Sequence, residues 1–176
     1  MKFMKAIKYL VIITLFILAL GSCRKIEQLP PVPLIKFTRF SVFDTTTLLG
    51  NFKAGRLEFY FEDGDGDLGL APPVGTETDT TDLYITLFRK KGGIMVASGD
   101  KNDVLLPYPA YRIPYMERLG VNKILKGTIS VSFLYMFYNT GDTIKYDFYV
   151  KDRALNESNL ESTSEIVVSE NKIYTK

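Results

Sequence analysis

Apolar and polar residues alternate with a period of two over most of the chain after residue 34. In the longest series, from Ile129 to Phe137, every second residue is apolar or aromatic. Successive side chains of a β-strand point to opposite faces, so this pattern is typical of strands with one face on a core and the other in water. No window of about 12 residues in the same region keeps an apolar stripe at helical spacing. The pattern therefore predicts an all-β fold.

Seven segments show this alternation, and turn-forming residues such as Gly92-Gly93 separate them. The predicted strands are residues 35–43, 55–62, 82–91, 94–98, 126–138, 142–151 and 163–170. The turn signal from Asn139 to Asp142 lies between two strong strands, which predicts a hairpin of residues 128–138 and 142–151. Short antiparallel strands at this spacing favour a β-sandwich of the immunoglobulin or fibronectin-like type, with a small closed barrel as the alternative.

The first 22 residues have the features of a secretion signal, in the usual order. Lys2, Lys5 and Lys8 give a positively charged start without an acidic residue. An apolar run of 12 residues, Tyr9 to Leu20, follows. This length suits a signal-peptide core and is short for a helix that spans a bilayer. Residues 1–22 are therefore expected to be a signal peptide.

The apolar run ends in Leu20-Gly21-Ser22-Cys23. This segment resembles the lipobox of bacterial prelipoproteins, in which an apolar residue and two small ones precede an invariant Cys. The resemblance implies that the chain is cut before Cys23, that the Cys23 thiol takes a diacylglyceryl group, and that the new amine takes an acyl chain such as palmitate. Cys23 is also the only Cys of the chain. An uncleaved N-terminal anchor helix is the alternative.

Residues 23–33 are expected to form the lipidated N-terminus and a tether, because Pro30, Pro31 and Pro33 favour an extended polyproline segment. Residues 34–176 are expected to form a single β-sandwich domain. Without the signal peptide the chain has 154 residues, enough to bury roughly two-thirds of its unfolded surface.

Composition excludes several kinds of function. Without the three lysines of the signal peptide, 19 basic residues stand against 20 acidic ones, so the basic pI of the full chain gives no reason to expect nucleic-acid binding. The chain has no His and no Cys besides Cys23. A Ser–His or Cys–His nucleophile and the common zinc sites are therefore excluded. Catalysis by carboxylates, Lys or Tyr remains open.

An acidic loop follows one of the predicted strands, with Asp63, Asp65 and Asp67 alternating with Gly64 and Gly66. Three carboxylates this close repel one another unless a cation lies among them, and the glycines let side-chain and backbone oxygens converge. Because hard oxygen ligands suit Ca²⁺, the three Asp are predicted calcium ligands. The alternative is a solvated acidic turn whose glycines only make the bend.

The acidic loop resembles the start of an EF-hand loop but departs from it at two positions. The sixth position is Leu68, where the EF-hand needs Gly, and the twelfth is Val74 rather than Glu. The segment is therefore not expected to be an EF-hand.

A second polar segment, Asp152 to Asn159 (DRALNESN), follows the predicted strand 142–151. It resembles the D-x-A-x-N-x-S segment near the end of many bacterial immunoglobulin-like and fibronectin-like modules, which implies that Asp and Asn cap the turn into the final strand. In an immunoglobulin-type sandwich the loops after the second and sixth strands lie at the same end. Asp152 and Asn156 are therefore predicted to complete the calcium shell, with the capping role as the alternative.

Three segments together resemble uncharacterised lipoproteins that are abundant in Bacteroidota: residues 61–69 (FEDGDGDLG), Tyr111 to Pro114, and residues 152–159. The resemblance covers most of the chain after the signal peptide and implies an envelope lipoprotein with an immunoglobulin-like domain, without naming an activity. Arg24-Lys25 stands where an acidic stretch often sends such proteins to the cell surface, which favours the periplasmic face of the outer membrane. Three triplets also resemble the O-glycosylation sites of that phylum, and they begin at Asp44, Asp79 and Asp142.

Two functions are consistent with these features. The first is a monomeric, non-catalytic binding or structural module, held at the outer membrane by its lipid and presenting loops to an unidentified protein or glycan. The second is a carboxylate-dependent hydrolase of envelope glycans, because crowding raises a carboxyl pKa. Its acids would come from the three Asp of the loop and Glu77. Clustered Asp on a Gly-rich loop is more typical of a cation site than of an acid–base pair, so the module is the preferred interpretation.

Overall fold

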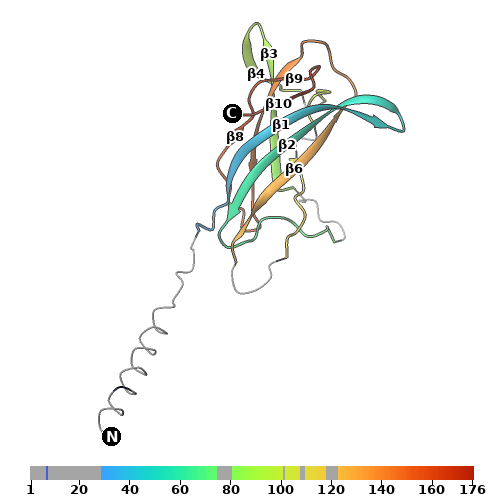
Figure 1. Cartoon of the computed structure of the whole chain (residues 1–176). Coiled ribbons are helices and arrows are strands. Elements are labelled where there is room, and N and C mark those ends of the chain that lie inside the picture. The colour runs from blue at the N-terminus through green and yellow to red at the C-terminus, as the bar shows by residue number, and fades with distance from the viewer. Residues whose placement is uncertain (1–6, 8–28, 75–80, 101, 108–109, 118–122) are drawn as a thin grey trace.

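The computed structural model describes residue 7 and residues 29–74, 81–100, 102–107, 110–117 and 123–176 (Figure 1). Apart from residue 7, the predicted signal peptide lies outside the described residues, as do the predicted lipidation site Cys23 and Glu77. Within the described part of the chain, no helix has the length and apolar character needed to cross a membrane.

Ten β-strands form in the described residues. In chain order they are β1 (Leu34–Thr47), β2 (Gly50–Asp63), β3 (Leu83–Lys91), β4 (Ile94–Ala97), β5 (Ala110–Tyr111), β6 (Leu125–Tyr135), β7 (Thr143–Val150), β8 (Glu161–Ser162), β9 (Ile166–Val167) and β10 (Lys172–Tyr174). Burial alternates most regularly along β7, where every second residue from Ile144 to Val150 is buried. The alternation in the sequence is therefore the alternation between core and solvent faces.

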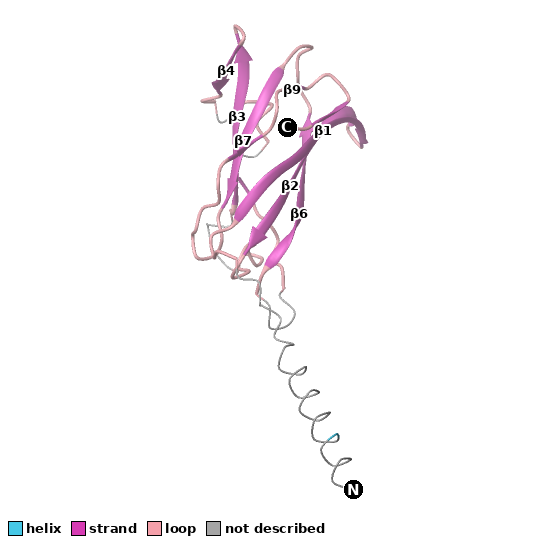
Figure 2. Cartoon of the chain, turned by 60° about the vertical axis from the view of Figure 1, so that its left-hand side comes forward, coloured by secondary structure: helices cyan, strands magenta, loops and turns pink. Residues whose placement is uncertain are grey.

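Two antiparallel sheets pack face to face, as Figure 2 shows. One sheet has the strand order β10-β1-β2-β6, and the other has the order β4-β3-β7-β8. The short strands β5 and β9 pair with β3 and β7. The predicted all-β sandwich is confirmed. The predicted strand at residues 163–170 is reduced to β9, and β10 at the edge of β1 was not predicted.

The predicted hairpin of residues 128–138 and 142–151 is wrong. β6 pairs with β2, with Lys53 opposite Tyr135, whereas β7 pairs with β3 in the other sheet. The turn signal from Asn139 to Asp142 therefore marks a crossover between the sheets. The aromatic residues of the two strands face each other across the core, and the ring centroids of Phe133 and Tyr146 lie 5.6 Å apart.

Aromatic rings from both sheets fill the space between them. Phe59 of β2 contacts Phe148 of β7 with ring centroids 5.2 Å apart, and Phe40 of β1 contacts Tyr146 at 5.7 Å. All four side chains are fully buried, and each Phe buried in this way contributes roughly 1.5–3 kcal/mol. Since Cys23 is the only Cys, this core rather than a disulfide stabilises the domain.

The described part of the predicted tether, from residue 29, meets the sandwich where β1 begins and β2 ends. Gly64, directly after β2, donates a backbone hydrogen bond of 3.1 Å to the carbonyl oxygen of Pro30. A Cβ at Gly64 would lie 2.3 Å from the carbonyl oxygens of Leu29 and Pro30, so this contact requires Gly. β7 ends here too, and its loop contacts the loop after β2. We call this the tether end, formed by residues 29–34 with the loops 64–70 and 152–160.

Candidate metal site

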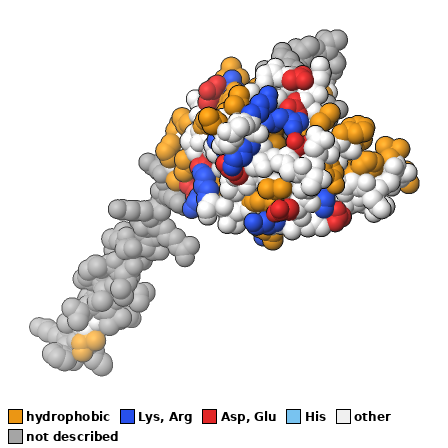
Figure 3. Space-filling view, turned by 90° about the horizontal axis from the view of Figure 1, so that it is seen from above, with side chains coloured by type: hydrophobic (Ala, Val, Ile, Leu, Met, Phe, Trp, Pro, Cys, Tyr) orange, Lys and Arg blue, Asp and Glu red, His pale blue; other side chains and the backbone are white. Residues whose placement is uncertain are grey.

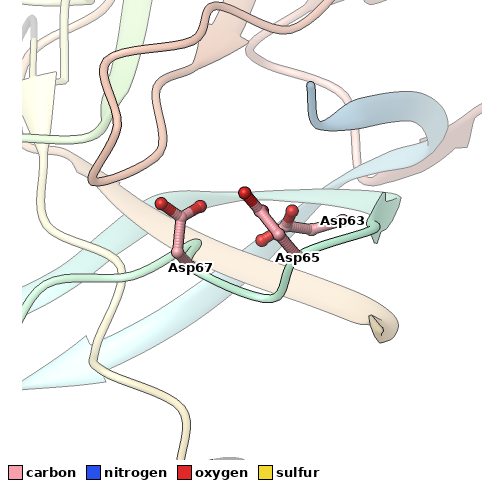
Figure 4. Close-up of side chains that lie close together, drawn as sticks. All are labelled: Asp63, Asp65 and Asp67. Atoms are coloured by element: carbon pink, nitrogen blue, oxygen red, sulfur yellow. The ribbon is translucent and has the colours of Figure 1, made fainter. Parts of the chain in front are cut away.

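The acidic loop curls back on itself directly after β2. Asp63 is the last residue of β2, and its Oδ2 accepts a hydrogen bond of 2.7 Å from the amide of Leu68. Gly66 and Gly69 have φ angles of 68° and 91°, which place them in the left-handed region that favours glycine. Leu68 is fully buried and anchors the loop on the core. These contacts fix a turn that holds the Asp side chains on one side of the loop (Figure 4).

The three carboxylates converge as predicted. One ligand oxygen from each of Asp63, Asp65 and Asp67 lies within 4.8 Å of the others. Asp63 is fully buried, and its Oδ1 has no hydrogen-bond partner among the described residues. A buried carboxylate oxygen without a donor costs free energy in the folded state. A cation among the three side chains would remove this cost and the mutual repulsion.

The electrostatic environment reflects this crowding. Burial, together with the nearby carboxylates of Asp152, Asp65 and Asp63, raises the pKa of Asp67 to about 6. The guanidinium of Arg153 opposes the shift. Burial also raises the pKa of Asp63, with a smaller contribution from Asp65. The described residues around the acidic loop therefore supply less positive charge than its carboxylates need.

The loop after β7 lies directly against the acidic loop, as the predicted topology required. The amide of Ala154 donates a 3.1 Å hydrogen bond to Asp67 Oδ2, and the amide of Arg153 donates one of 3.3 Å to Asp67 O. The Arg153 guanidinium donates to the carbonyl oxygens of Gly69 at 2.7 Å and Gly66 at 3.5 Å. The two loops are separated by more than 80 residues in the sequence and form one unit in space.

Asp152 and Asn156 have the geometry of the capping alternative. Asp152 is buried, with Oδ1 accepting from the Asn156 amide at 2.7 Å and Oδ2 from Asn156 Nδ2 at 2.8 Å. Both of its carboxylate oxygens are thus used within their own loop. In the described part of the chain, the cluster of mutually close ligand oxygens contains only the three Asp of the acidic loop. A ligand role for Asp152 and Asn156 stays a prediction, and the geometry favours a supporting role.

The structural roles of two further residues, Arg153 and Asp82, could not be predicted from the sequence. Arg153 joins the two loops, but an Arg in a polar loop is ordinarily solvated. Asp82 is fully buried and accepts a 2.5 Å hydrogen bond from the amide of Ile113. Burial raises the pKa of Asp82 to about 7. Both roles depend on distant chain segments that meet only in the folded protein.

The fold and the site together define a two-sheet antiparallel β-sandwich with a carboxylate cluster in a loop at one end. Comparison with family models, with curated proteins and with solved structures finds no match to the chain.

Proposed function

We propose that this chain is a lipid-anchored β-sandwich of the bacterial outer membrane, facing the periplasm, which serves as a non-catalytic binding or structural module and is stabilised by a calcium ion. The observation that carries the cation site is the buried Oδ1 of Asp63, which has no hydrogen-bond partner in the described structure and adjoins the carboxylates of Asp65 and Asp67. Ca²⁺ takes six to eight oxygen ligands, so backbone oxygens or water would complete its shell.

The lipid anchor in this proposal comes from the sequence from Leu20 to Cys23 and is supported by the position of the tether. Pro30 is bonded to Gly64 at one end of the sandwich. A domain attached in this way presents its opposite end away from the membrane. That arrangement suits a module that offers its remote loops to a protein or glycan partner.

The strand order supports an immunoglobulin-like fold in most respects. In that fold the first two strands share a sheet with the fifth, and the third strand pairs with the sixth in the other sheet. β1, β2 and the later strand β6 share one sheet here, and β3 pairs with β7 in the other. The fourth strand differs from the constant type because β4 pairs with β3.

The carboxylate-dependent hydrolase is the weaker interpretation. Glycoside hydrolysis needs two carboxyl groups on either side of a sugar bond, roughly 5–9.5 Å apart and open to substrate. Asp63 is fully buried and bonded to the amide of Leu68, so a sugar cannot reach it without unfolding the loop. The other two carboxylates of the acidic loop, Asp65 and Asp67, lie on the same side of the loop as Asp63 rather than facing it across a cleft.

Thermal unfolding with calcium and with a chelator tests the cation site. A ligand present at about 100 times its Kd stabilises the native state by about 2.7 kcal/mol, which corresponds to a rise in Tm of roughly 5–10 °C for a domain of this size. Asp65→Asn combined with Asp67→Asn should abolish the rise. Asp44→Asn, at an exposed carboxylate remote from the site, is the matched control and should keep it. A wild-type Tm that is unchanged by calcium would overturn the cation site.

A further inference from the structure

The tether end is held close to the membrane by the length of the tether. Seven residues, from Cys23 to Leu29, precede Pro30, whose carbonyl oxygen is bonded to Gly64. A fully extended chain spans at most about 3.6 Å per residue, so seven residues reach about 25 Å. If Cys23 carries the lipid, the loops of the tether end lie within this distance of the headgroups.

This end of the domain also exposes large apolar side chains to solvent. They lie on several chain segments and include Val32 (45% exposed), Leu34 (54%), Tyr115 (48%), Leu155 (72%) and Leu160 (64%). Tyr115 belongs to this end because its amide donates to Leu70 O. Leu160 does so because its neighbour Asn159 bonds the backbone of Ile35. Apolar side chains gathered on one end of a domain are typical of a contact surface.

Leu155 is the most informative of these residues. Its φ angle is +66°, and it is the single non-glycine residue with positive φ among the described residues. A left-handed conformation costs an apolar L-residue about 1–2 kcal/mol, and Gly or Asn would adopt it more easily. The side chain is also largely exposed, so it gains little from burial. Strain of this kind clusters at functional sites.

The net charge of the tether end determines whether this surface can approach an anionic membrane. The three carboxylates of the acidic loop would repel anionic lipid headgroups. A bound Ca²⁺ would offset two of the three negative charges. Arg112 and Arg153, which donate to Leu70 O and Gly69 O, further reduce the negative charge of this end.

We propose that the tether end docks on the lipid surface that holds the anchor, with Leu155 entering the headgroup region, and that calcium in the acidic loop permits docking on anionic lipids. This inference rests on the proposed function, because the anchor and the cation both belong to it. The opposite end also exposes apolar side chains, as Figure 3 shows from that side, and these include Leu48 and Ile94. β1 runs from the tether end to Thr47, directly before Leu48, so the tether would hold Leu48 away from the membrane.

The absence of Trp from the chain provides a direct test. Leu155→Trp places a single indole at the proposed contact, and Leu48→Trp places one at the opposite end as the matched control. Both positions are exposed, so neither substitution disturbs the core. Each protein, purified with its native N-terminus from bacterial membranes, is reconstituted in phosphatidylcholine–phosphatidylglycerol vesicles with and without brominated acyl chains. In calcium, brominated lipid should reduce the fluorescence of Leu155→Trp by about twofold and leave that of Leu48→Trp unchanged.

Flotation of the same vesicles separates the possible failures. Protein that does not float with the vesicles lacks the anchor, which overturns the proposed function and the docking together. Protein that floats but shows equal quenching at the two positions overturns the docking alone. Quenching of Leu155→Trp that persists unchanged with a chelator overturns the role given to calcium. Quenching that is confined to Leu155→Trp and lost with the chelator supports the whole proposal.

Discussion

The backbone amide of Ala154 donates a 3.1 Å hydrogen bond to Asp67 Oδ2, which lies 87 residues earlier in the chain. The guanidinium of Arg153 adds a 2.7 Å bond to the carbonyl oxygen of Gly69 and lies 5.0 Å above the ring of Tyr115. The acidic loop is therefore fixed on one side by the loop after β7. The geometry of the three carboxylates depends on both loops.

Arg153→Ala should destabilise the domain and loosen this junction. The substitution removes the charge-assisted hydrogen bond to the carbonyl oxygen of Gly69, worth about 1.5–3 kcal/mol, so chemical denaturation should show a loss of about 2 kcal/mol. Hydrogen exchange at the Ala154 amide should become faster. Arg56→Ala is the matched control, because Arg56 also lies over an aromatic ring, Phe43, but on an exposed strand face. Equal losses in the two variants would contradict a special role for Arg153.

The hydrogen bonds of two buried tyrosines, Tyr135 and Tyr146, can be tested by substitution. Tyr146 OH donates to Leu105 O at 2.7 Å and lies 3.0 Å from Tyr135 OH. Tyr146→Phe leaves Tyr135 OH and Leu105 O without their hydrogen-bond partner, so it should lower the free energy of unfolding by about 2–3 kcal/mol. Tyr135→Phe keeps the bond from Tyr146 to Leu105 and should lower it by about 1 kcal/mol. Urea denaturation of the two variants gives the comparison. The reverse order of stability would show that the bond to Leu105 is not the stronger constraint.

Much of the fold could be predicted from the sequence, because the alternation of apolar and polar residues indicates which face of a strand is buried. Leu57, Phe59 and Phe61 alternate with polar neighbours, and all three are buried in β2. The pairing of the strands was harder to predict from the sequence. The turn residues Asn139 to Asp142 are compatible with a hairpin and with a crossover between sheets. Which of the two forms depends on the strands with which β6 and β7 pair.

The candidate site could be predicted from the sequence to a similar degree. The spacing of Asp63, Asp65 and Asp67 predicted their convergence, since alternate residues of a glycine-rich turn share one side. For Asp152 and Asn156 the sequence offered a ligand role and a capping role, and it could not decide between them. The Asp152 carboxylate accepts hydrogen bonds from Asn156 within a turn that passes through a left-handed residue, Leu155, and sequence patterns do not reveal this turn.

Leu155→Asn should stabilise the isolated domain. Asn adopts the left-handed region more easily than Leu, and the exposed side chain loses little burial, so the gain should be about 1 kcal/mol. A rise in Tm of roughly 2–4 °C would report it for a domain of this size. Leu160→Asn removes a similarly exposed leucine whose φ angle is not positive, and it should give no rise. A lower Tm for Leu155→Asn would mean that Leu155 packs against the domain.

Cys23→Ser should leave the protein unlipidated and unprocessed. The lipobox resemblance makes the Cys23 thiol the acceptor of the diacylglyceryl group, and a Ser hydroxyl does not replace it. Labelling with radioactive palmitate in a bacterial host that processes lipoproteins should mark the wild type and not the variant. The variant should also migrate as the longer precursor. Undiminished label on Cys23→Ser would end the lipoprotein interpretation.

Asp82 should make the stability of the domain depend on pH. It is fully buried, its Oδ1 accepts from the Ile113 amide, and its Oδ2 has no hydrogen-bond partner among the described residues. Burial raises its pKa to about 7, against about 3.9 for an unfolded Asp. The folded state therefore binds the proton more tightly, so the contribution of Asp82 to stability is fully present below about pH 4 and is lost as the pH rises through about 7.

Asp82→Asn removes this dependence and keeps an oxygen acceptor for the Ile113 amide. A difference of about 3 pKa units corresponds to an upper limit of about 4 kcal/mol, so the variant should gain up to that amount at pH 8 and little at pH 4. Urea denaturation of both proteins across this range, with a chelator present, isolates the effect of the one carboxyl. Asp44→Asn is the control, because a hydrogen bond from Lys53 lowers the pKa of Asp44, so its removal should give no gain at pH 8. Stability curves of wild type and Asp82→Asn that run parallel between pH 4 and pH 8 would show that Asp82 is ionised throughout, and that an unseen donor or cation compensates its burial.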